Sequence, residues 1–303
     1  MERGWLERLQ DGDVVLIDGG TGSELRRRGV PMSPEAWSGL AARDNESTLR
    51  AIHEAYIRAG ADVITTNTFG TSRFVLQSAG LAAQFATLNR LAVGAAQAAR
   101  ADVADRPVAI AGSMSCLPPR FDPDSYPARA LEREAYRELA ALLADCGVDI
   151  IALEMLQDVE HGSLALSAAL ETGLPVWLGV SARRRDGRLV AYDYPERRLE
   201  PVLEDLVSLG PTVVNVMHTP IDAVGAALDA VKRHWAGPLG AYPELGSDYP
   251  ENAPSPEALV DCALECVGRG ARLIGGCCGS GPEHIAALTA ARARLLAARN
   301  PSV

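Results

Sequence analysis

The sequence is poor in aromatic residues and in positive charge. Phe, Trp and Tyr make up 5% of the 303 residues, so a hydrophobic core must be built mainly from Ala, Leu, Val and Ile. Arg and Lys number 29 against 39 Asp and Glu, which gives a formal net charge of −10. Proteins that bind nucleic acid or an anionic membrane present a basic face. The acidic balance therefore disfavours both kinds of partner.

Long hydrophobic runs are also missing. No stretch reaches the roughly 18 consecutive apolar residues typical of a membrane-spanning helix, and the first residues lack the apolar core of a secretory signal. Six cysteines in 303 residues do not resemble the disulfide framework of a small secreted domain. We therefore expect a protein of the reducing cytoplasm, whose cysteine thiols are free to bind a metal ion.

The sequence does contain a regular alternation of short apolar runs and long segments rich in Ala, Leu, Arg and Glu. The runs predicted to be strands are 14–17, 61–64, 108–111, 149–153, 176–180, 212–216, 239–242 and 271–274. The segments predicted to be helices are 45–60, 84–102, 130–146, 159–172, 199–209, 221–235, 255–270 and 282–300. Apolar strands joined by helical crossovers form a parallel sheet with both faces covered. Eight such units predict an α/β protein with a (β/α)8 barrel that spans residues 1–303 as one domain, with a doubly wound open sheet as the alternative.

Polar side chains follow most of the predicted strands. They are Asp18, Asn67, Ser113, Glu154, Asn215, Tyr242, Cys277 and Cys278. In a (β/α)8 barrel the C-terminal ends of the strands meet at one mouth, and the active site lies there. Turns after strands also favour Asp and Asn for backbone reasons alone. The set as a whole, more than any one member, indicates a site.

The segment Gly275-Gly276-Cys277-Cys278-Gly279 ends the last predicted strand. Adjacent cysteines rarely form a disulfide with each other, because the bond requires particular Cα and Cβ separations. Two thiolates at a strand end can instead hold one soft metal ion from the same side. The alternative is a pair of small buried residues in a tight turn, and the surrounding glycines favour the metal site over it.

The segment Asp18-Gly19-Gly20-Thr21-Gly22 follows the first predicted strand. It lacks the spacing and the lysine of the known phosphate-binding loops, and the Asp18 carboxylate would repel a phosphate. A carboxylate suits an ammonium group, and glycine N–H groups suit a carboxylate. With Glu154 as a second acidic group, we expect the mouth to bind the amine of an amino acid. A structural ion pair between Glu154 and an arginine is the alternative.

Four motifs occur together in barrel order. They are Asp18-Gly19-Gly20-Thr21-Gly22-Ser23-Glu24-Leu25 with Arg28-Gly29, Gly60-Ala61-Asp62-Val63-Ile64-Thr65-Thr66-Asn67-Thr68-Phe69-Gly70, Ala111-Gly112-Ser113, and Gly275-Gly276-Cys277-Cys278-Gly279. In this combination the sequence resembles the homocysteine S-methyltransferase family. That family includes betaine-dependent enzymes and the homocysteine-binding module of cobalamin-dependent methionine synthase.

The resemblance implies a (β/α)8 barrel and a zinc ion held by three cysteines, two of which match Cys277 and Cys278. In the family, zinc binds the homocysteine sulfur as a thiolate, which attacks an activated methyl group. A zinc ion lowers the pKa of a thiol, so the nucleophilic thiolate exists at neutral pH. On this basis the predicted catalytic residues are Asp18 and Glu154, and the predicted substrate-binding residues are Asp18, Gly19, Gly20, Asn67, Ser113, Glu154 and Asn215.

The third zinc cysteine of the family follows an Asn at the end of the sixth strand. Here Asn215 is followed by Val216, which cannot bind a metal ion. His218 is the nearest competent ligand, and mixed Cys/His zinc sites are common. Cys116, after the third predicted strand, is a second candidate, and a site without tightly bound zinc is the third alternative.

The methyl donor is harder to read from the sequence. In betaine-type enzymes an aromatic residue after the Thr-Phe of strand two helps to cage the quaternary ammonium by cation–π attraction, and Gly70 takes that place here. Trp37 and Tyr242 are possible aromatic walls, and a sulfonium donor fits somewhat better than betaine. We predict a methyltransferase that acts on homocysteine or a related thiol, with a homo-oligomer possible. The alternatives are a diverged barrel enzyme with another methyl acceptor and a non-catalytic protein that binds an amino acid or thiol.

Overall fold

The structure, a computed structural model, describes residues 3–246 and 254–299. Eight parallel strands lie side by side in the order β1, β10, β9, β8, β5, β4, β3, β2. Their bounds are β1 Val15–Leu16, β2 Val63–Thr65, β3 Ala109–Ser115, β4 Ile150–Leu156, β5 Val176–Val180, β8 Val213–Pro220, β9 Leu239–Glu244 and β10 Leu273–Ile274. A parallel bridge between Ile17 and Val63 joins the first strand of this row to the last. The expected (β/α)8 barrel is confirmed.

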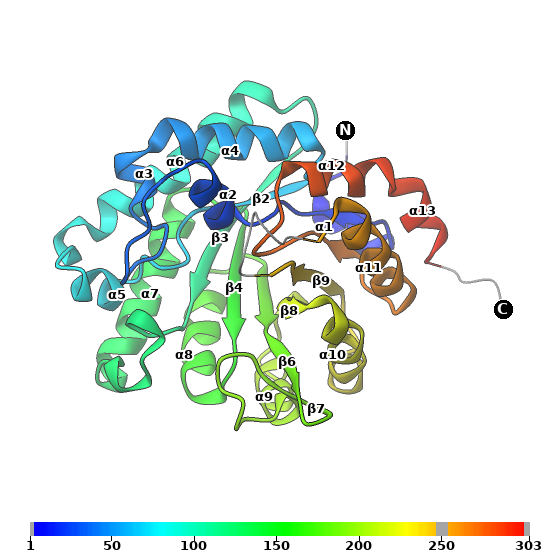
Figure 1. Cartoon of the computed structure of the whole chain (residues 1–303). Helices are drawn as coiled ribbons and strands as arrows, with labels where there is room; N and C mark the ends of the chain where they lie inside the picture. The colour runs from blue at the N-terminus through cyan, green and yellow to red at the C-terminus, as the bar shows by residue number, and fades with distance from the viewer. Residues whose placement is uncertain (1–2, 247–253, 300–303) are drawn as a thin grey trace.

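Eight helices, one after each barrel strand, pack around the ring of strands (Figure 1). They are α4 Glu46–Ala59, α6 Phe85–Val103, α7 Arg129–Asp145, α8 Val159–Leu170, α9 Leu199–Val207, α10 Ile221–His234, α11 Pro256–Gly268 and α12 Pro282–Ala290. Local sequence explains several ends. Gly60 ends α4 with a φ of 107°, and the Ser255 side chain accepts a hydrogen bond from the Ala258 N–H at the start of α11. The predicted last helix is divided at Ala291 into α12 and α13 Arg292–Ala297.

Alternating strand residues build two separate hydrophobic layers. Leu16 belongs to the large cluster between strands and helices, whereas Val15 and Ile17 belong to a second cluster inside the barrel. This alternation follows from the two-residue period of a strand. It determines which side chains can reach the mouth.

The N-terminal end of the barrel is closed by α1 Trp5–Gln10, a helix that the sequence analysis did not predict. The Trp5 ring meets the Trp177 ring edge-on, with 5.4 Å between centroids. Leu9 of the same helix is buried in the cluster inside the barrel. The opposite, C-terminal end is therefore the one available for a site.

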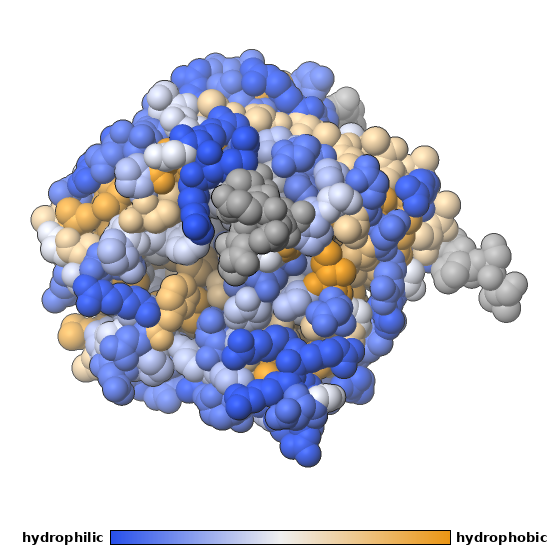
Figure 2. All heavy atoms as spheres, viewed as in Figure 1, coloured by the Kyte–Doolittle hydropathy of each residue, from blue (hydrophilic) through white to orange (hydrophobic). Residues whose placement is uncertain are grey.

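Further elements that the sequence analysis missed lie in the connections between strands and main helices. They are α2 Thr21–Arg27, α3 Ala41–Asp44, α5 Arg73–Ser78, three short 3-10 turns (η1 Ala82–Gln84, η2 Pro119–Phe121, η3 Pro123–Ser125) and the antiparallel hairpin of β6 Ala182–Arg185 and β7 Arg188–Ala191. Polar residues cover most of the face seen in Figure 2. Among the described residues, no helix has the length and apolar character needed to cross a membrane.

Candidate active site

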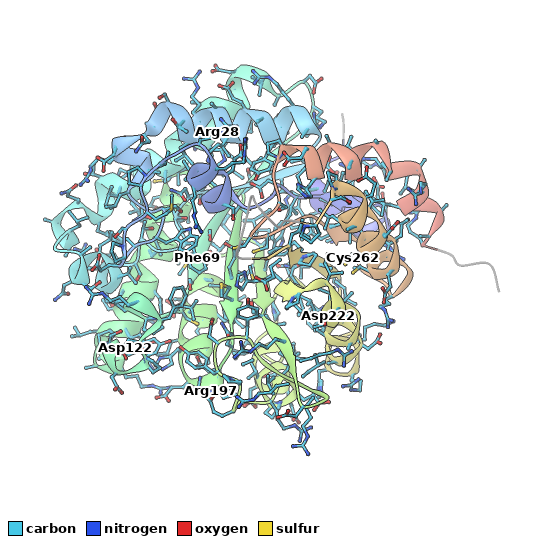
Figure 3. All side chains as sticks on the ribbon, viewed as in Figure 1. Arg28, Phe69, Asp122, Arg197, Asp222 and Cys262 are labelled. Atoms are coloured by element: carbon cyan, nitrogen blue, oxygen red, sulfur yellow. The ribbon has the colours of Figure 1, made fainter. Side chains whose placement is uncertain are left out.

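A cavity of about 460 Å³ opens at the C-terminal ends of the strands. Its wall includes residues that follow β1, β2 and β10 and residues within β3, β4, β8 and β9. Phe69, one of the lining residues, lies near the middle of the view, while Asp122 and Arg197 lie nearer its lower edge (Figure 3). The mouth predicted from the polar strand ends is therefore a real cavity, and most of the predicted residues face it.

A β-bulge in β8 brings His218 into this cavity. Regular alternation places Val216 toward the helices and Met217 toward the barrel interior, so His218 would be expected to point outward. The register of β8 against β9 shifts between Met217 and Pro220, and His218 has a φ of 42°. A bulge with a left-handed residue turns two successive side chains to one side. Met217 and His218 consequently both line the cavity.

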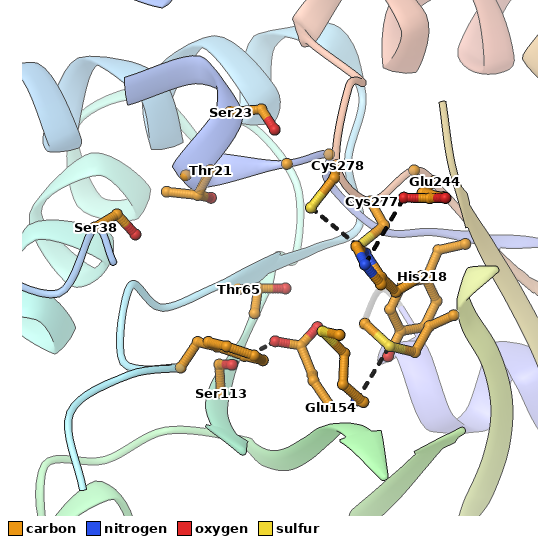
Figure 4. A pocket seen from close by; sticks show the side chains of 18 of the residues that line it. Thr21, Ser23, Ser38, Thr65, Ser113, Glu154, His218, Glu244, Cys277 and Cys278 are labelled. Carbon is orange, nitrogen blue, oxygen red and sulfur yellow. Dashed lines mark hydrogen bonds and ion pairs between the residues drawn. The ribbon is translucent and has the colours of Figure 1, made fainter. Parts of the chain in front are cut away.

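His218, Cys277 and Cys278 form a cluster of possible metal ligands (Figure 4). Their ligand atoms all lie within 4.8 Å of one another. The Cys277 Sγ is 3.6 Å from the His218 Nδ1 and 4.0 Å from the Cys278 Sγ. Two thiols and one imidazole on converging strand ends are the donor types that a zinc site uses.

The charge of the cysteine pair is uneven. A hydrogen bond between the thiols raises the pKa of Cys277 and lowers the pKa of Cys278. Burial alone would lower the pKa of His218, but the Cys278 thiolate and the carboxylates of Glu244 and Asp193 outweigh it and raise that pKa. The pair thus favours one thiolate beside a basic imidazole, an electron-rich site for a cation.

Glu244, which the sequence analysis did not single out, lies on the other side of His218. Its Oε2 is 3.7 Å from the His218 Nε2, and its Oε1 accepts a hydrogen bond of 2.8 Å from the Tyr192 hydroxyl. Burial raises the pKa of Glu244. The Tyr192 ring also lies 4.6 Å from the His218 ring, centroid to centroid.

Two glycines after β1 allow the chain to approach the cysteine segment closely. A Cβ at Gly20 would lie 2.6 Å from the Cys277 carbonyl oxygen, and one at Gly19 would lie 2.8 Å from the Ser280 carbonyl oxygen. The Gly20 N–H donates to the Ser280 carbonyl oxygen over 3.0 Å. Any side chain here would push the two segments apart. Gly20 therefore positions the cysteines, and its N–H is not free for a substrate carboxylate as the sequence analysis expected.

Asp18 is buried in the cavity wall and linked to the next strand. Its Oδ2 accepts a 2.7 Å hydrogen bond from the Thr65 N–H, and its Oδ1 accepts one of 2.9 Å from the Thr65 hydroxyl. Burial raises the pKa of Asp18 to about 8, and the nearby negative charge of Glu154 adds to the shift. A cation placed in the cavity would stabilise the ionised form.

Glu154 presents the second carboxylate, from a bulge in β4. The register against β5 shifts between Leu153 and Leu156, and Met155 has a φ of 58°, so Glu154 and Met155 both line the cavity. The Ser113 hydroxyl donates to the Glu154 Oε2. Burial and the negative charge of Cys278 raise the pKa of Glu154 to about 7. No arginine partner of Glu154 occurs among the described residues, so the structural ion pair weighed as an alternative is not formed.

Asn67 and the two predicted aromatic walls also line the cavity. The Asn67 Oδ1 accepts from the Ser38 hydroxyl over 2.7 Å, and its Nδ2 donates to the Ser38 carbonyl oxygen over 2.8 Å. Asn67 thus fixes the segment that carries Trp37, which is 40% exposed. Tyr242 is buried at the inner end of the cavity.

Two predicted candidates, Asn215 and Cys116, lie outside this cavity, as does Val216, which replaces the third cysteine of the family. Asn215 is fully buried inside the barrel, two residues before Met217 in β8. Neither of its side-chain polar atoms has a hydrogen-bond partner among the described residues. Val216 packs in the layer under the helices. Cys116 is buried in the same layer, and its carbonyl oxygen accepts a hydrogen bond from Tyr126. Of the two proposed third ligands, the structure brings only His218 to Cys277 and Cys278.

The remaining cysteines occupy structural positions. Cys262 and Cys266 are buried in the hydrophobic layer, with sulfurs 4.0 Å apart, and Cys262 lies on α11 outside the ring of strands (Figure 3). Their i, i+4 spacing places both side chains on the same face of α11. Cys146 lies at the C-terminus of α7.

Comparisons with known proteins agree with this geometry. A profile of the family described as homocysteine S-methyltransferase matches residues 15–292. The homocysteine S-methyltransferase of Escherichia coli (strain K12) is 28% identical over 93% of this chain and 96% of its own length. Betaine–homocysteine S-methyltransferase 1 of Bos taurus is 27% identical over 95% of this chain and 74% of its own length.

Solved structures give the same answer. The metallated form of the homocysteine methyltransferase MmuM from Escherichia coli matches with a TM-score of 0.77 and 25% identity, over 94% of this chain and 99% of that chain. The family match spans nearly the whole barrel, and the cavity lies where the four sequence motifs meet. The chain belongs to the homocysteine S-methyltransferase family.

Proposed function

We propose that this protein transfers a methyl group from an onium donor to the thiol of homocysteine, giving methionine, or to a closely related thiol. The proposal rests on one observation: His218, Cys277 and Cys278 share one cavity with the carboxylates of Glu154 and Asp18. An amino acid with a thiol side chain has the two groups that these walls would bind. Membership of the family supplies the reaction class.

The donor set fits a zinc ion. Two thiols and one imidazole with ligand atoms within 4.8 Å of one another match a catalytic site with three protein ligands and one position left for a substrate atom. His218, Cys277 and Cys278 would hold the ion. When bound there, zinc would lower the pKa of the homocysteine thiol, so that its thiolate is present at neutral pH.

The other cavity residues bind and orient the substrate. Glu154 keeps its Oε1 free of the Ser113 hydroxyl and would accept the substrate ammonium group. Asp18, whose two oxygens are held by Thr65, adds negative charge behind it. The cavity-lining Arg26 supplies a cation for a substrate carboxylate.

The donor side of the cavity has aromatic surface. Trp37, Phe69 and Tyr242 line it, and aromatic faces attract sulfonium and quaternary ammonium groups. This supports S-methylmethionine, S-adenosylmethionine or betaine as the class of donor. We further propose one barrel domain over residues 1–303, a cytoplasmic location in which the thiols stay reduced, and a homo-oligomer as the form to test by light scattering.

The test is a methylation assay with purified, zinc-loaded protein. Homocysteine is incubated with each of the three donors, and methionine is measured by mass spectrometry. We expect methionine with at least one donor and none with a Cys277→Ser, Cys278→Ser double variant. If no thiol is methylated by any donor, while calorimetry detects homocysteine binding, the protein is a binding protein and the proposal is wrong.

A further inference from the structure

We infer that Glu244 and Tyr192 position His218 as a metal ligand, with the imidazole Nδ1 directed to the cysteine sulfurs and the proton held on Nε2. The inference rests on the metal set proposed above and assigns the two residues that complete it. Neither residue would itself bind the metal. Glu244 acts on the ring, and Tyr192 acts on Glu244.

A chain of contacts leads from the cysteine sulfurs through His218 and Glu244 to Tyr192. The His218 Nδ1 faces the Cys277 Sγ at 3.6 Å, and on the opposite edge of the ring the Nε2 faces the Glu244 Oε2 at 3.7 Å. The other carboxylate oxygen, Oε1, is held by the Tyr192 hydroxyl at 2.8 Å. Figure 4 shows the cysteines and the Glu244 carboxylate next to the His218 ring. When the Nε2–H is directed to the carboxylate, the neutral ring keeps its lone pair on Nδ1, which faces the sulfurs.

This arrangement has a chemical purpose at a metal site. A histidine that binds a metal must offer the lone pair of a neutral ring, and a carboxylate that accepts the other N–H fixes the tautomer and makes the ring more basic. Two thiolates and a neutral imidazole also carry one negative charge fewer than three thiolates. The Glu244 carboxylate places one negative charge next to the ligands and so compensates for the missing thiolate.

The backbone around His218 shows why the ring needs this support. His218 adopts a left-handed φ of 42° in the β8 bulge, a conformation that costs a non-glycine residue free energy. Thr219 stabilises the bulge, because its hydroxyl donates to the Met217 carbonyl oxygen over 2.9 Å and accepts from the Ala182 N–H over 3.0 Å. These contacts fix the backbone and leave the rotation of the imidazole to be set by its own neighbours.

Tyr192 ties the β6–β7 hairpin region to the site. It follows β7 directly, and its ring lies against the imidazole, with 4.6 Å between centroids and an angle of 59°. The same residue therefore covers one face of His218 and holds the carboxylate that faces its edge. The hairpin is an insertion between β5 and α9, and this contact gives it a role in the site.

The experiment compares zinc affinities by competition with a chelator. We expect Glu244→Ala to weaken zinc binding by about 10- to 100-fold, the usual effect of removing an outer partner of a histidine ligand. Glu244→Gln should recover part of the loss, because an amide oxygen in the same place can also accept from the Nε2–H. Tyr192→Phe should weaken zinc binding by about two- to tenfold, the value of one hydrogen bond.

Asp193→Asn is the matched control. Asp193 lines the cavity and also places negative charge near His218, but its carboxylate is engaged by the Gln157 side chain at 2.6 Å. If general charge were responsible, this variant would weaken zinc binding as much as Glu244→Ala. We expect a change of less than about threefold, below the range for outer partners.

Cobalt substitution distinguishes a positioning residue from a ligand. The visible absorption bands of the Co²⁺-loaded Glu244→Ala protein should keep the positions seen in the wild type, because the ligands are the same. A shift of these bands would make Glu244 a ligand and overturn the inference. Unchanged zinc affinity in both Glu244 variants would also overturn it and leave the proposed methyl transfer intact, whereas a wild-type protein that binds no zinc would overturn both.

Discussion

The two walls of the cavity hold their polar groups in different ways. On one wall, His218, Cys277 and Cys278 converge within 4.8 Å, with sulfur and nitrogen atoms facing one another. On the other wall, Asp18 and Glu154 each keep a hydroxyl partner of their own, Thr65 and Ser113. The first wall gathers donors around one point, and the second keeps two like charges separate.

The difference shows what each wall lacks. Convergent thiols and an imidazole are stabilised by a cation that they can all reach. Buried carboxylates with pKa values of about 8 and 7 are held partly protonated until a positive group enters. A metal ion would complete the first wall and a substrate ammonium group the second.

Removing a sulfur should cause the largest loss of activity, through the loss of zinc binding at the first wall, and should leave Asp18 and Glu154 in place. In Cys277→Ser we expect zinc binding to be lost and kcat/KM for homocysteine to fall by about 1,000-fold or more, because both the thiolate population and its placement are lost. Zinc content and kcat/KM are measured on the same preparations. Full activity in a zinc-free variant would contradict the division of roles between the walls.

Removing the accessible carboxylate should damage the second wall alone. Glu154→Gln leaves the substrate ammonium group without its charged partner, which costs about 2–5 kcal/mol, or roughly 30-fold or more in kcat/KM. Zinc binding should stay within the error of the wild type. Loss of zinc in this variant would show that the walls are not independent.

Position 218, and not position 216, should control the metal. In a His218→Ala background, adding Val216→Cys should leave zinc binding weak, because Val216 packs under the helices, whereas His218→Cys alone should keep zinc binding. We expect the two variants to differ by at least tenfold in zinc affinity, about 1.4 kcal/mol. If Val216→Cys restored zinc binding, β8 would have to adopt a register without the bulge between Met217 and Pro220.

The carboxylate wall should also lower stability as the pH rises. The folded-state pKa of Asp18, about 8, lies above its ordinary value, so between the two values the folded protein binds more protons than the unfolded chain. This contribution to the free energy of unfolding is present at low pH and is lost as the pH rises toward 8.

Asp18→Asn removes this pH-dependent contribution to the free energy of unfolding. Relative to the wild type, the variant should gain stability between pH 6 and pH 8, by at most about 1.4 kcal/mol per pH unit. Urea denaturation at both pH values measures the difference. If the variant and the wild type show the same dependence on pH between pH 6 and pH 8, Asp18 is already ionised in the folded, ligand-free protein.

The regular parts of this molecule were predictable from its sequence. Apolar runs and capping residues located all eight barrel strands and their helices, because each depends on local periodicity. The same rule would have found Glu244. It lies two residues after Tyr242, so the alternation of the strand points both side chains inward. The predicted strand ended at Tyr242, whereas β9 continues to Glu244.

The irregular parts were not predictable in this way. His218 and Met155 owe their directions to bulges with positive φ values, which depend on the register of neighbouring strands and leave no pattern in composition. Asn215 looked equivalent to the other strand-end residues, yet it lies a layer deeper. Tyr192 reaches the site only through a hairpin whose short strands carry charged residues.

The cysteine segment is anchored to the other end of the chain. The Gly20 N–H donates to the Ser280 carbonyl oxygen, and the Gly279 N–H donates to the Ser23 hydroxyl over 3.1 Å, across more than 250 residues. The ring of strands must close before Cys277 and Cys278 reach their final places. Metal uptake during refolding would therefore report the last step of assembly, when the first and last strands meet.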